Sequence, residues 1–313
     1  MDSLTLVKAH KYIQNKSGYH SFLVIKNGYL VFEKYYSGFD KEKLNNLKSA
    51  TKSITSILIG IALKKNIIKD INQPLENIFP EYFVEDTDSL KRKITLKHLL
   101  TMTAGLKWNN FGGSIRNSWW NHKDDPHKYA INKPQLIHTS GEVFNYNSAL
   151  SHLLAAVIVK KSGITLLEFA KKNLFNPLGI SQIKWSTDNT GLHRGHSELW
   201  MTSRDMAKVG YLYLRNGYWY DKRIVSKRWV KESLEPYIDG TGVWAKYGSY
   251  GYQWWSRIIN GVSVYFAAGY GGQFIFIIPK HDIVVVTTTK WYRRGNSFTP
   301  IDIVRNYIIP SIK

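Results

Sequence analysis

The residues of this chain that are best placed to do chemistry are a serine and a lysine three positions apart, Ser49 and Lys52. An apolar run at residues 54–63 follows them and predicts a helix. Side chains three residues apart on a helix lie on the same face, one turn along. A serine hydroxyl is a poor nucleophile until a base removes its proton, and a desolvated lysine can become neutral and act as that base. The segment therefore suggests covalent catalysis by a serine without a histidine.

The same spacing recurs at Ser181 and Lys184. This second copy runs into residues 185–191, which are rich in turn-forming residues and cannot sustain a helix, so Ser181 is interpreted as a turn residue. The first copy has its own alternative, in which Ser49 only caps the helix and Lys52 is solvated. Taken alone, the first pair leaves both interpretations open.

Two further segments carry groups that could assist such a pair. Tyr146 and Ser148 lie at a predicted junction between a loop and a helix, where a phenol and a hydroxyl would be presented together. Gly269 and Tyr270 lie in a glycine-rich turn after a predicted strand. Glycine lets a backbone approach closely, so an amide there could complete an oxyanion hole with the amide of Ser49. Alone, each segment is explained better by packing and capping or by an ordinary hairpin.

The elements that must position these groups follow from the apolar pattern. A first helix is predicted at 3–16, and an Asn-Gly turn joins predicted strands at 21–25 and 29–33. Helices are predicted at 95–102, 147–161, 165–173 and 202–216, then strands at 252–257, 262–267, 273–278 and 283–289, and a closing helix at 300–309. This order predicts an α+β fold, with one antiparallel sheet built from both chain ends, flanking helices and an inserted, mostly helical lobe. The α/β lobe would comprise about residues 1–66 and 235–313, and the helical lobe about 67–234.

Composition limits the chemistry and the partners. The chain has no cysteine, which excludes disulfides, thiolate metal sites and a cysteine nucleophile. The 43 Lys and Arg against 23 Asp and Glu give a net charge of +20, which favours anionic surroundings. Because the cations form only short clusters, solvated surfaces are favoured over a nucleic-acid site, while an anionic cell-wall polymer remains an option. No transmembrane segment or signal peptide is visible, so the compartment stays open, with an extracytoplasmic location favoured slightly.

Together and in this order, the three motifs resemble the serine β-lactamase and penicillin-binding-protein superfamily. The nearest branch is similar to the class C type, which includes family VIII carboxylesterases and 6-aminohexanoate-oligomer hydrolases. The resemblance covers most of the chain and implies a β-lactamase/transpeptidase-like fold. It also implies that Ser49 is the nucleophile, that Lys52 and Tyr146 share the proton transfers, and that the amides of Ser49 and Tyr270 bind the oxyanion. Neither a metal nor another cofactor is implied.

Two departures from the family pattern bear on the substrate. Ser148 stands where this branch usually has asparagine, and would hydrogen-bond Lys52 or the substrate. Ala267 replaces the lysine of the K-T-G motif, which in β-lactamases faces the substrate carboxylate. A hydrogen bond between a cation and a carboxylate contributes roughly 1.5–3 kcal/mol. Esters or amides without that carboxylate are therefore favoured.

The remaining site predictions concern the walls of the cleft. Gly269 would contact the substrate. Trp119, Trp120, Trp254 and Trp255 are candidates for an apolar wall, with Trp119 and Trp254 chosen first, although core or lobe-interface packing is the favoured explanation for them. The histidines at 98, 138 and 196 show no metal-ligand spacing. The main prediction is a serine hydrolase that forms an acyl-enzyme on a carboxylic ester or amide. A β-lactamase or D-Ala-D-Ala carboxypeptidase is the first alternative, and a catalytically idle binder of anionic wall polymer or nucleic acid is the second.

Overall fold

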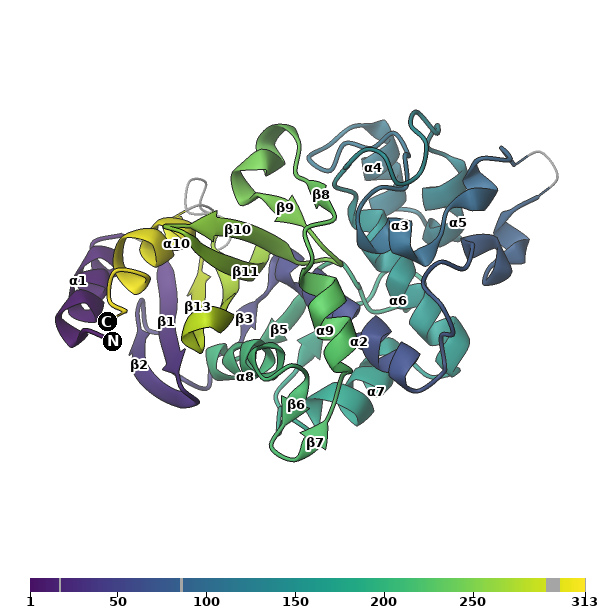
Figure 1. The fold of residues 1–313 in the computed structure, drawn as a ribbon. Coiled ribbons are helices and arrows are strands. Elements are labelled where there is room, and N and C mark those ends of the chain that lie inside the picture. The colour runs from purple at the N-terminus through teal and green to yellow at the C-terminus, as the bar shows by residue number, and fades with distance from the viewer. Residues whose placement is uncertain (17, 85–86, 291–298, 313) are drawn as a thin grey trace.

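The two ends of the chain form one antiparallel sheet in the computed structural model, which describes residues 1–16, 18–84, 87–290 and 299–312 (Figure 1). Its eight strands lie in the order β2-β1-β13-β12-β11-β10-β9-β8. Their bounds are β1 Tyr19–Lys26, β2 Tyr29–Tyr35, β8 Ile238–Asp239, β9 Ser249–Tyr250, β10 Trp255–Ile259, β11 Val262–Gly269, β12 Gln273–Ile278 and β13 Ile283–Thr289. Because β1 pairs with both β2 and β13, the first hairpin joins the last strand. The predicted sheet is confirmed.

The first hairpin turns where the sequence predicted. Asn27 and Gly28 both have positive φ, at +52° and +82°, as a two-residue type I′ turn requires. The flanking residues Lys26 and Tyr29 pair across the turn. Asparagine and glycine are the residues that adopt this backbone conformation most readily.

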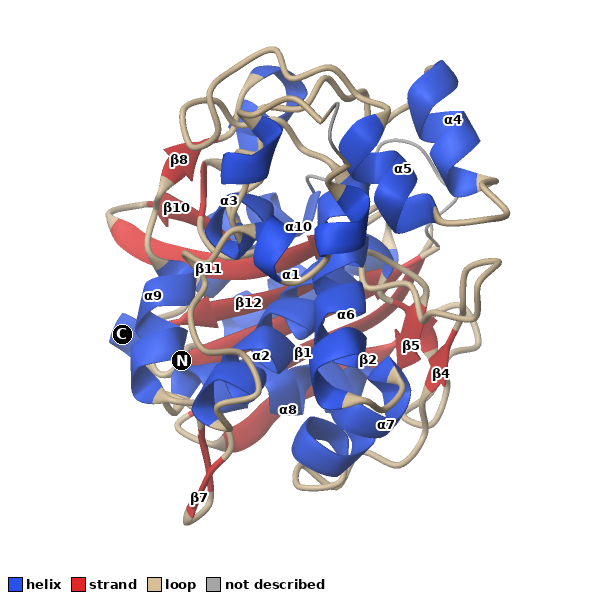
Figure 2. Ribbon diagram, turned by 90° about the vertical axis from the view of Figure 1, so that its right-hand side faces the viewer, coloured by secondary structure: helices blue, strands red, loops and turns tan. Residues whose placement is uncertain are grey.

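Helices cover both faces of the sheet (Figure 1). Helix α1 (Ser3–Gln14) lies on one face beside the closing helix, which is α10 (Thr299–Ile303) followed by a π-helical turn (Val304–Ile308). On the other face, α8 (Ser203–Leu214) packs against β1, β12 and β13, with α2 (Thr51–Lys64) nearby (Figure 2). The predicted boundaries assign α8 to the helical lobe, whereas its buried face packs on the sheet. A side chain at Gly210 would come within 2.5 Å of Val284, so glycine permits this close packing.

The segment between the two halves of the sheet is mostly helical. Its α-helices are α3 Leu96–Leu100, α4 Ser114–Trp120, α5 Pro126–Asn132, α6 Ser148–Ser162, α7 Leu166–Ala170 and α9 Lys227–Leu234. A π-helical turn, Lys171–Phe175, continues α7, and short 3-10 helices lie at Lys48–Ala50, Leu75–Asn77, Pro80–Tyr82, Lys91–Lys93, Gly242–Tyr247 and Pro279–His281. A small sheet contains β3 (Asn45–Asn46), β5 (Leu199–Met201) and β4 (Lys184–Trp185), and β6 (Tyr218–Trp219) forms a hairpin with β7 (Lys222–Arg223). The main hydrophobic core runs through both parts of the molecule.

One predicted strand, 252–257, begins later than expected. Gln253 has a φ of +63°, so the chain turns there and β10 starts only at Trp255. The Gln253 side chain donates to the carbonyls of Leu99 and Leu100 and accepts from Ser151. This buried amide therefore ties α3 and α6 to the sheet. Among the described residues, no helix is long and apolar enough to cross a bilayer.

Candidate active site

The first serine and lysine pair meets at the start of α2, the helix at the centre of the molecule. Ser49 lies in the 3-10 helix Lys48–Ala50, which continues directly into α2. The Lys52 Nζ lies 3.2 Å from the Ser49 Oγ and donates a 2.9 Å hydrogen bond to the carbonyl of His196. Lys52 is only 1% exposed, and this burial lowers its pKa to about 7. A large share of the lysine is therefore neutral near pH 7, as a general base must be.

The second pair does not form such an arrangement. Ser181 lies outside the regular elements, and Lys184 begins the short strand β4 with an exposed side chain. The two residues therefore do not share a helical face. This placement confirms the interpretation of Ser181 as a residue outside any helix.

Tyr146 joins the serine and lysine from the loop before α6. Its ring centre lies 5.1 Å from the Lys52 Nζ, and its phenol is close enough to the Ser49 side chain for the serine to lower the pKa of the phenol. Burial raises the pKa of Tyr146 above its ordinary value, and Ser49 offsets only part of that effect. The phenol therefore stays protonated near neutral pH. It is suited to pass a proton on rather than to act as a standing phenolate.

An aromatic residue that sequence reasoning missed holds Tyr146 in place. Trp244, from the 3-10 helix Gly242–Tyr247, stacks on the Tyr146 ring with centroids 4.0 Å apart. Phe111 in turn stacks on the Trp244 ring, with the two ring centroids 5.3 Å apart. Trp244 carries no motif of its own, and it is separated from Tyr146 by almost a hundred positions. Only the fold brings them together.

The turn after β11 approaches the nucleophile closely. A side-chain carbon at Gly269 would lie 2.1 Å from the carbonyl oxygen of Leu47, two residues before Ser49. In the described part of the chain, neither the amide of Ser49 nor that of Tyr270 donates a hydrogen bond. Both amides border the same cavity. They are therefore available to a substrate carbonyl oxygen, in the arrangement of an oxyanion hole.

Gly269→Ala should weaken catalysis because the new methyl group meets rigid backbone at Leu47. We expect kcat/KM for an activated ester to fall by about tenfold to a thousandfold, the range seen when an oxyanion donor is lost. Overpacking should also destabilise the protein by about 1–3 kcal/mol. Gly112→Ala is the matched control, since nothing lies within 4 Å of the added carbon and no positive φ is involved. Equal kinetics for the two variants would contradict the proposed close approach.

A cavity of about 600 Å³ opens in front of Ser49. Its walls are largely aromatic, with Phe111, Trp120, Tyr146, Trp244, Tyr247, Trp255 and Tyr270. Lys48, Arg116 and Lys246 bring positive charge to it, and Glu198 pairs with Lys48 at 2.8 Å. The cavity therefore suits a substrate with apolar or aromatic parts around a central carbonyl group.

The two tryptophans chosen first as wall residues do not border this cavity. Trp254 is completely buried and stacks on Tyr213, and Trp119 packs between Trp108 and His152. Their chain neighbours Trp255 and Trp120 form the wall instead. Adjacent residues of an extended chain face opposite sides, and adjacent residues of a helix are about 100° apart. All four tryptophans were wall candidates with packing as the favoured alternative, and the structure places Trp120 and Trp255 at the cavity and Trp119 and Trp254 in packing.

The two departures from the family motifs also have defined places. Ser148 is the first residue of α6 and borders the cavity, with its amide bonded to the Asn110 side chain. Among the described hydrogen bonds, none joins Ser148 to Lys52. Ala267 is fully buried, and Ala268 borders the cavity. Neither alanine offers a cation, so the positive charge near the cavity comes from other elements.

A cluster of His127, His152 and Asp188 lies behind the cavity, with one donor atom from each within 4.8 Å of the others. Such a set could hold a metal ion, but the hydrogen bonds favour another role. The Gly195 amide donates to the His152 Nδ1, so the neutral ring carries its proton on Nε2 and donates it to Asp188 at 2.8 Å. Burial lowers the pKa of His152 to about 4, which keeps the ring neutral. This pair fixes the loop that carries the His196 carbonyl.

Several known proteins resemble this chain. Residues 18–301 match the protein family described as Beta-lactamase. A 6-aminohexanoate-dimer hydrolase of Paenarthrobacter ureafaciens is 24% identical over 297 residues, covering 87% of this chain and 72% of that protein. A lovastatin esterase of Penicillium rubens is 29% identical over 158 residues, covering 43% of this chain and 38% of that protein. The solved structure of an octameric penicillin-binding protein homologue from Pyrococcus abyssi aligns with a TM-score of 0.74 at 21% identity, covering 97% of this chain and 76% of that chain. This likeness confirms the fold that the motifs implied.

Proposed function

Because the chain belongs to the Beta-lactamase family, we propose that it is a serine hydrolase whose Ser49 forms an acyl-enzyme with a carboxylic ester or amide. The observation that carries the proposal is the buried lysine beside the serine. Lys52 lies 3.2 Å from the hydroxyl, and its pKa is lowered to about 7. A solvated lysine that merely accompanied a capping serine would have neither property.

The acylation step uses three groups. As the Ser49 Oγ attacks the carbonyl carbon, its proton moves to the neutral Lys52 Nζ. The carbonyl oxygen becomes an oxyanion and accepts hydrogen bonds from the amides of Ser49 and Tyr270. When the tetrahedral intermediate collapses, the bond to the leaving group breaks and that group takes a proton. Tyr146 supplies it and is reprotonated by Lys52, because the phenol lies beside Ser49 and stays protonated near neutral pH.

Deacylation runs the same path in reverse with water. A water molecule takes the place of the leaving group and loses a proton through Tyr146 and Lys52 as its oxygen attacks the acyl carbon. The second intermediate then collapses, the acyl bond to Ser49 breaks, and the serine oxygen regains a proton. The products are the carboxylic acid and the alcohol or amine, and the enzyme returns to its initial state.

The cavity supports an ester or amide substrate more than a β-lactam. Ala267 and Ala268 leave the end of β11 without the cation that would face a β-lactam carboxylate. The relatives named as a dimer hydrolase and as an esterase act on an amide and an ester by those names. Arg116 and Lys246 border the cavity from other elements, and this observation keeps the β-lactamase or peptidase alternative as a second candidate.

Intact-mass spectrometry after brief exposure to p-nitrophenyl butyrate, nitrocefin or penicillin tests both candidates. We expect the ester to leave a transient butyryl adduct on the peptide that contains Ser49 and to be turned over. We expect kcat/KM for nitrocefin to be about tenfold to a hundredfold lower than kcat/KM for the ester, because the hydrogen bond between a cation and the substrate carboxylate is missing. No adduct and no turnover with any compound would overturn the proposed function. Fast nitrocefin hydrolysis would instead favour the second candidate.

A further inference from the structure

The hairpin β6–β7 projects from the body of the molecule (Figure 1), and its first strand and turn carry three aromatic residues, Tyr218, Trp219 and Tyr220. Tyr220, at its tip, is 87% exposed, and Tyr218 is also exposed. Trp219 contacts the Tyr220 ring and lies over Tyr211 of α8. Trp219 is half-buried and packs against the core, whereas the rings of Tyr218 and Tyr220 are exposed and therefore available to a partner.

Exposed cations surround this tip. Residues 215–231 contain one acidic residue, Asp221, and six cationic residues. The cations are Arg215, Lys222, Arg223, Lys227, Arg228 and Lys231. All six side chains are exposed. Only Arg228 forms an ion pair within the described part of the chain, with Glu232. The segment therefore presents an excess of positive charge that Asp221 and Glu232 compensate only in part.

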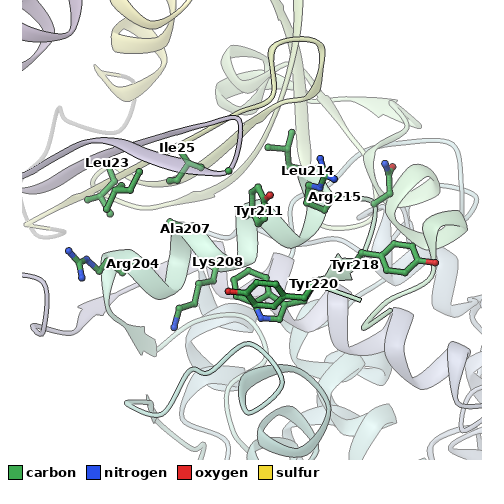
Figure 3. Close-up of a pocket in the computed structure, with 14 residues that line it drawn as sticks. Leu23, Ile25, Arg204, Ala207, Lys208, Tyr211, Leu214, Arg215, Tyr218 and Tyr220 are labelled. Atoms are coloured by element: carbon green, nitrogen blue, oxygen red, sulfur yellow. The ribbon is translucent and has the colours of Figure 1, made fainter. Parts of the chain in front are cut away.

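A cavity of about 790 Å³ lies beside the hairpin, and its wall includes Arg204 and Lys208 as well as apolar residues (Figure 3). Leu23 and Ile25 of β1 border it together with Ala207 and Leu214 of α8, and the hairpin aromatics border its other side. Arg215 lies at this cavity too. The exposed ring surface of the tip is therefore continuous with further apolar surface rather than isolated.

We propose that this basic hairpin face, defined by residues 215–227, docks on an anionic phospholipid bilayer. The cations are drawn to the negative surface, where each Lys or Arg contributes about 1 kcal/mol. Tyr218, Trp219 and Tyr220 enter the headgroup region, which suits rings that carry a polar atom at one end. The proposal is independent of the chemistry at Ser49.

A bilayer fits this face better than a linear polyanion does. Proteins that track a single strand use a charged groove with aromatic platforms along it, whereas these aromatic residues lie on a projecting hairpin (Figure 1). A projection reaches a flat surface before the body of the molecule does. An acidic polymer without bases would need only the cations, so an effect of the aromatic tip distinguishes it from a bilayer.

Sedimentation of the full chain with vesicles tests the proposal. We expect binding to phosphatidylcholine vesicles that contain phosphatidylglycerol, weakening as salt rises, and little binding to pure phosphatidylcholine. Lys222→Gln with Lys227→Gln should weaken binding by about 30-fold, at about 1 kcal/mol for each cation. Tyr220→Asn, a residue that tolerates the φ of +51° at this position, should weaken it by about fivefold to tenfold through the lost ring.

Two matched variants serve as controls. Lys8→Gln with Lys11→Gln removes the same charge from exposed positions of α1, and Ile258→Asn removes an exposed apolar side chain from β10. Both should bind as the unchanged protein does, with melting temperatures reported for every variant. Equal weakening by the controls, or equal binding to neutral vesicles, would overturn the proposal. A second result would also overturn it, namely tight binding of single-stranded DNA or polyglutamate together with unchanged vesicle binding by Tyr220→Asn. That result would identify a site for polyanions.

Discussion

Ser49→Ala should lower kcat/KM for an activated ester by at least about 10⁴-fold and abolish the covalent adduct. The reason is that no other described group can take the place of the attacking oxygen. Removing the nucleophile of a serine hydrolase costs on the order of 10⁶-fold, and only binding and the oxyanion hole remain. The measurement is steady-state hydrolysis of p-nitrophenyl butyrate together with intact mass.

Ser181→Ala provides the matched control for this prediction. It changes the serine of the second S-x-x-K segment, which lies outside any helix. Its activity should stay within about twofold of the unchanged protein, in line with a substitution away from the site. If Ser49→Ala retained the adduct, or if both variants lost activity equally, Ser49 would not be the nucleophile.

Local sequence information was enough to choose between the two serines. The apolar run after Lys52 predicted a helix, and the turn residues after Lys184 argued against one, because both signals depend on neighbours in the chain. The same local logic predicted six of the eight strands of the main sheet, all but the two-residue strands β8 and β9, and the Asn27-Gly28 turn. Elements with a strong local period are the ones that a sequence reveals.

The parts of the site that depend on distant contacts could not be predicted. The carbonyl of His196 anchors Lys52 across 144 positions, and a backbone carbonyl carries no residue-specific signal. Trp244 reached Tyr146 only through the fold, and the choice between Trp254 and Trp255 depended on which face the chain presents after Gln253. The two-residue strands of the smaller sheets were missed for a related reason, since they are too short to show any period.

Lys52→Met should lower kcat/KM by about 10³-fold or more, because the proton of Ser49 would lose its acceptor. Lys184→Met is the matched control, which changes the exposed lysine of the second segment and should leave activity nearly unchanged. In the unchanged protein, activity should rise with pH through about 7, where Lys52 loses its proton. That rise should be absent from the residual activity of Lys52→Met.

Stability should separate a catalytic lysine from a merely structural one. The pKa of Lys52 is about 7 in the folded protein and about 10.5 in the unfolded chain. Below pH 7 the lysine is charged in both states, so folding bears the full cost of burying the charge. Between these two values the unfolded chain binds more protons, so stability rises with pH, and above about 10.5 it changes no further.

Lys52→Met should therefore be more stable than the unchanged protein at low pH and less stable at high pH. A gap of this size in pKa is worth on the order of 5 kcal/mol. Methionine also leaves the buried His196 carbonyl without its donor, at a cost of about 1–3 kcal/mol. The net effect of Lys52→Met is then stabilisation by about 2–4 kcal/mol near pH 6, with a reversal of sign between about pH 8 and pH 10. Melting temperatures measured across this range would show the two curves crossing, and parallel curves would mean that Lys52 stays charged and cannot be the base.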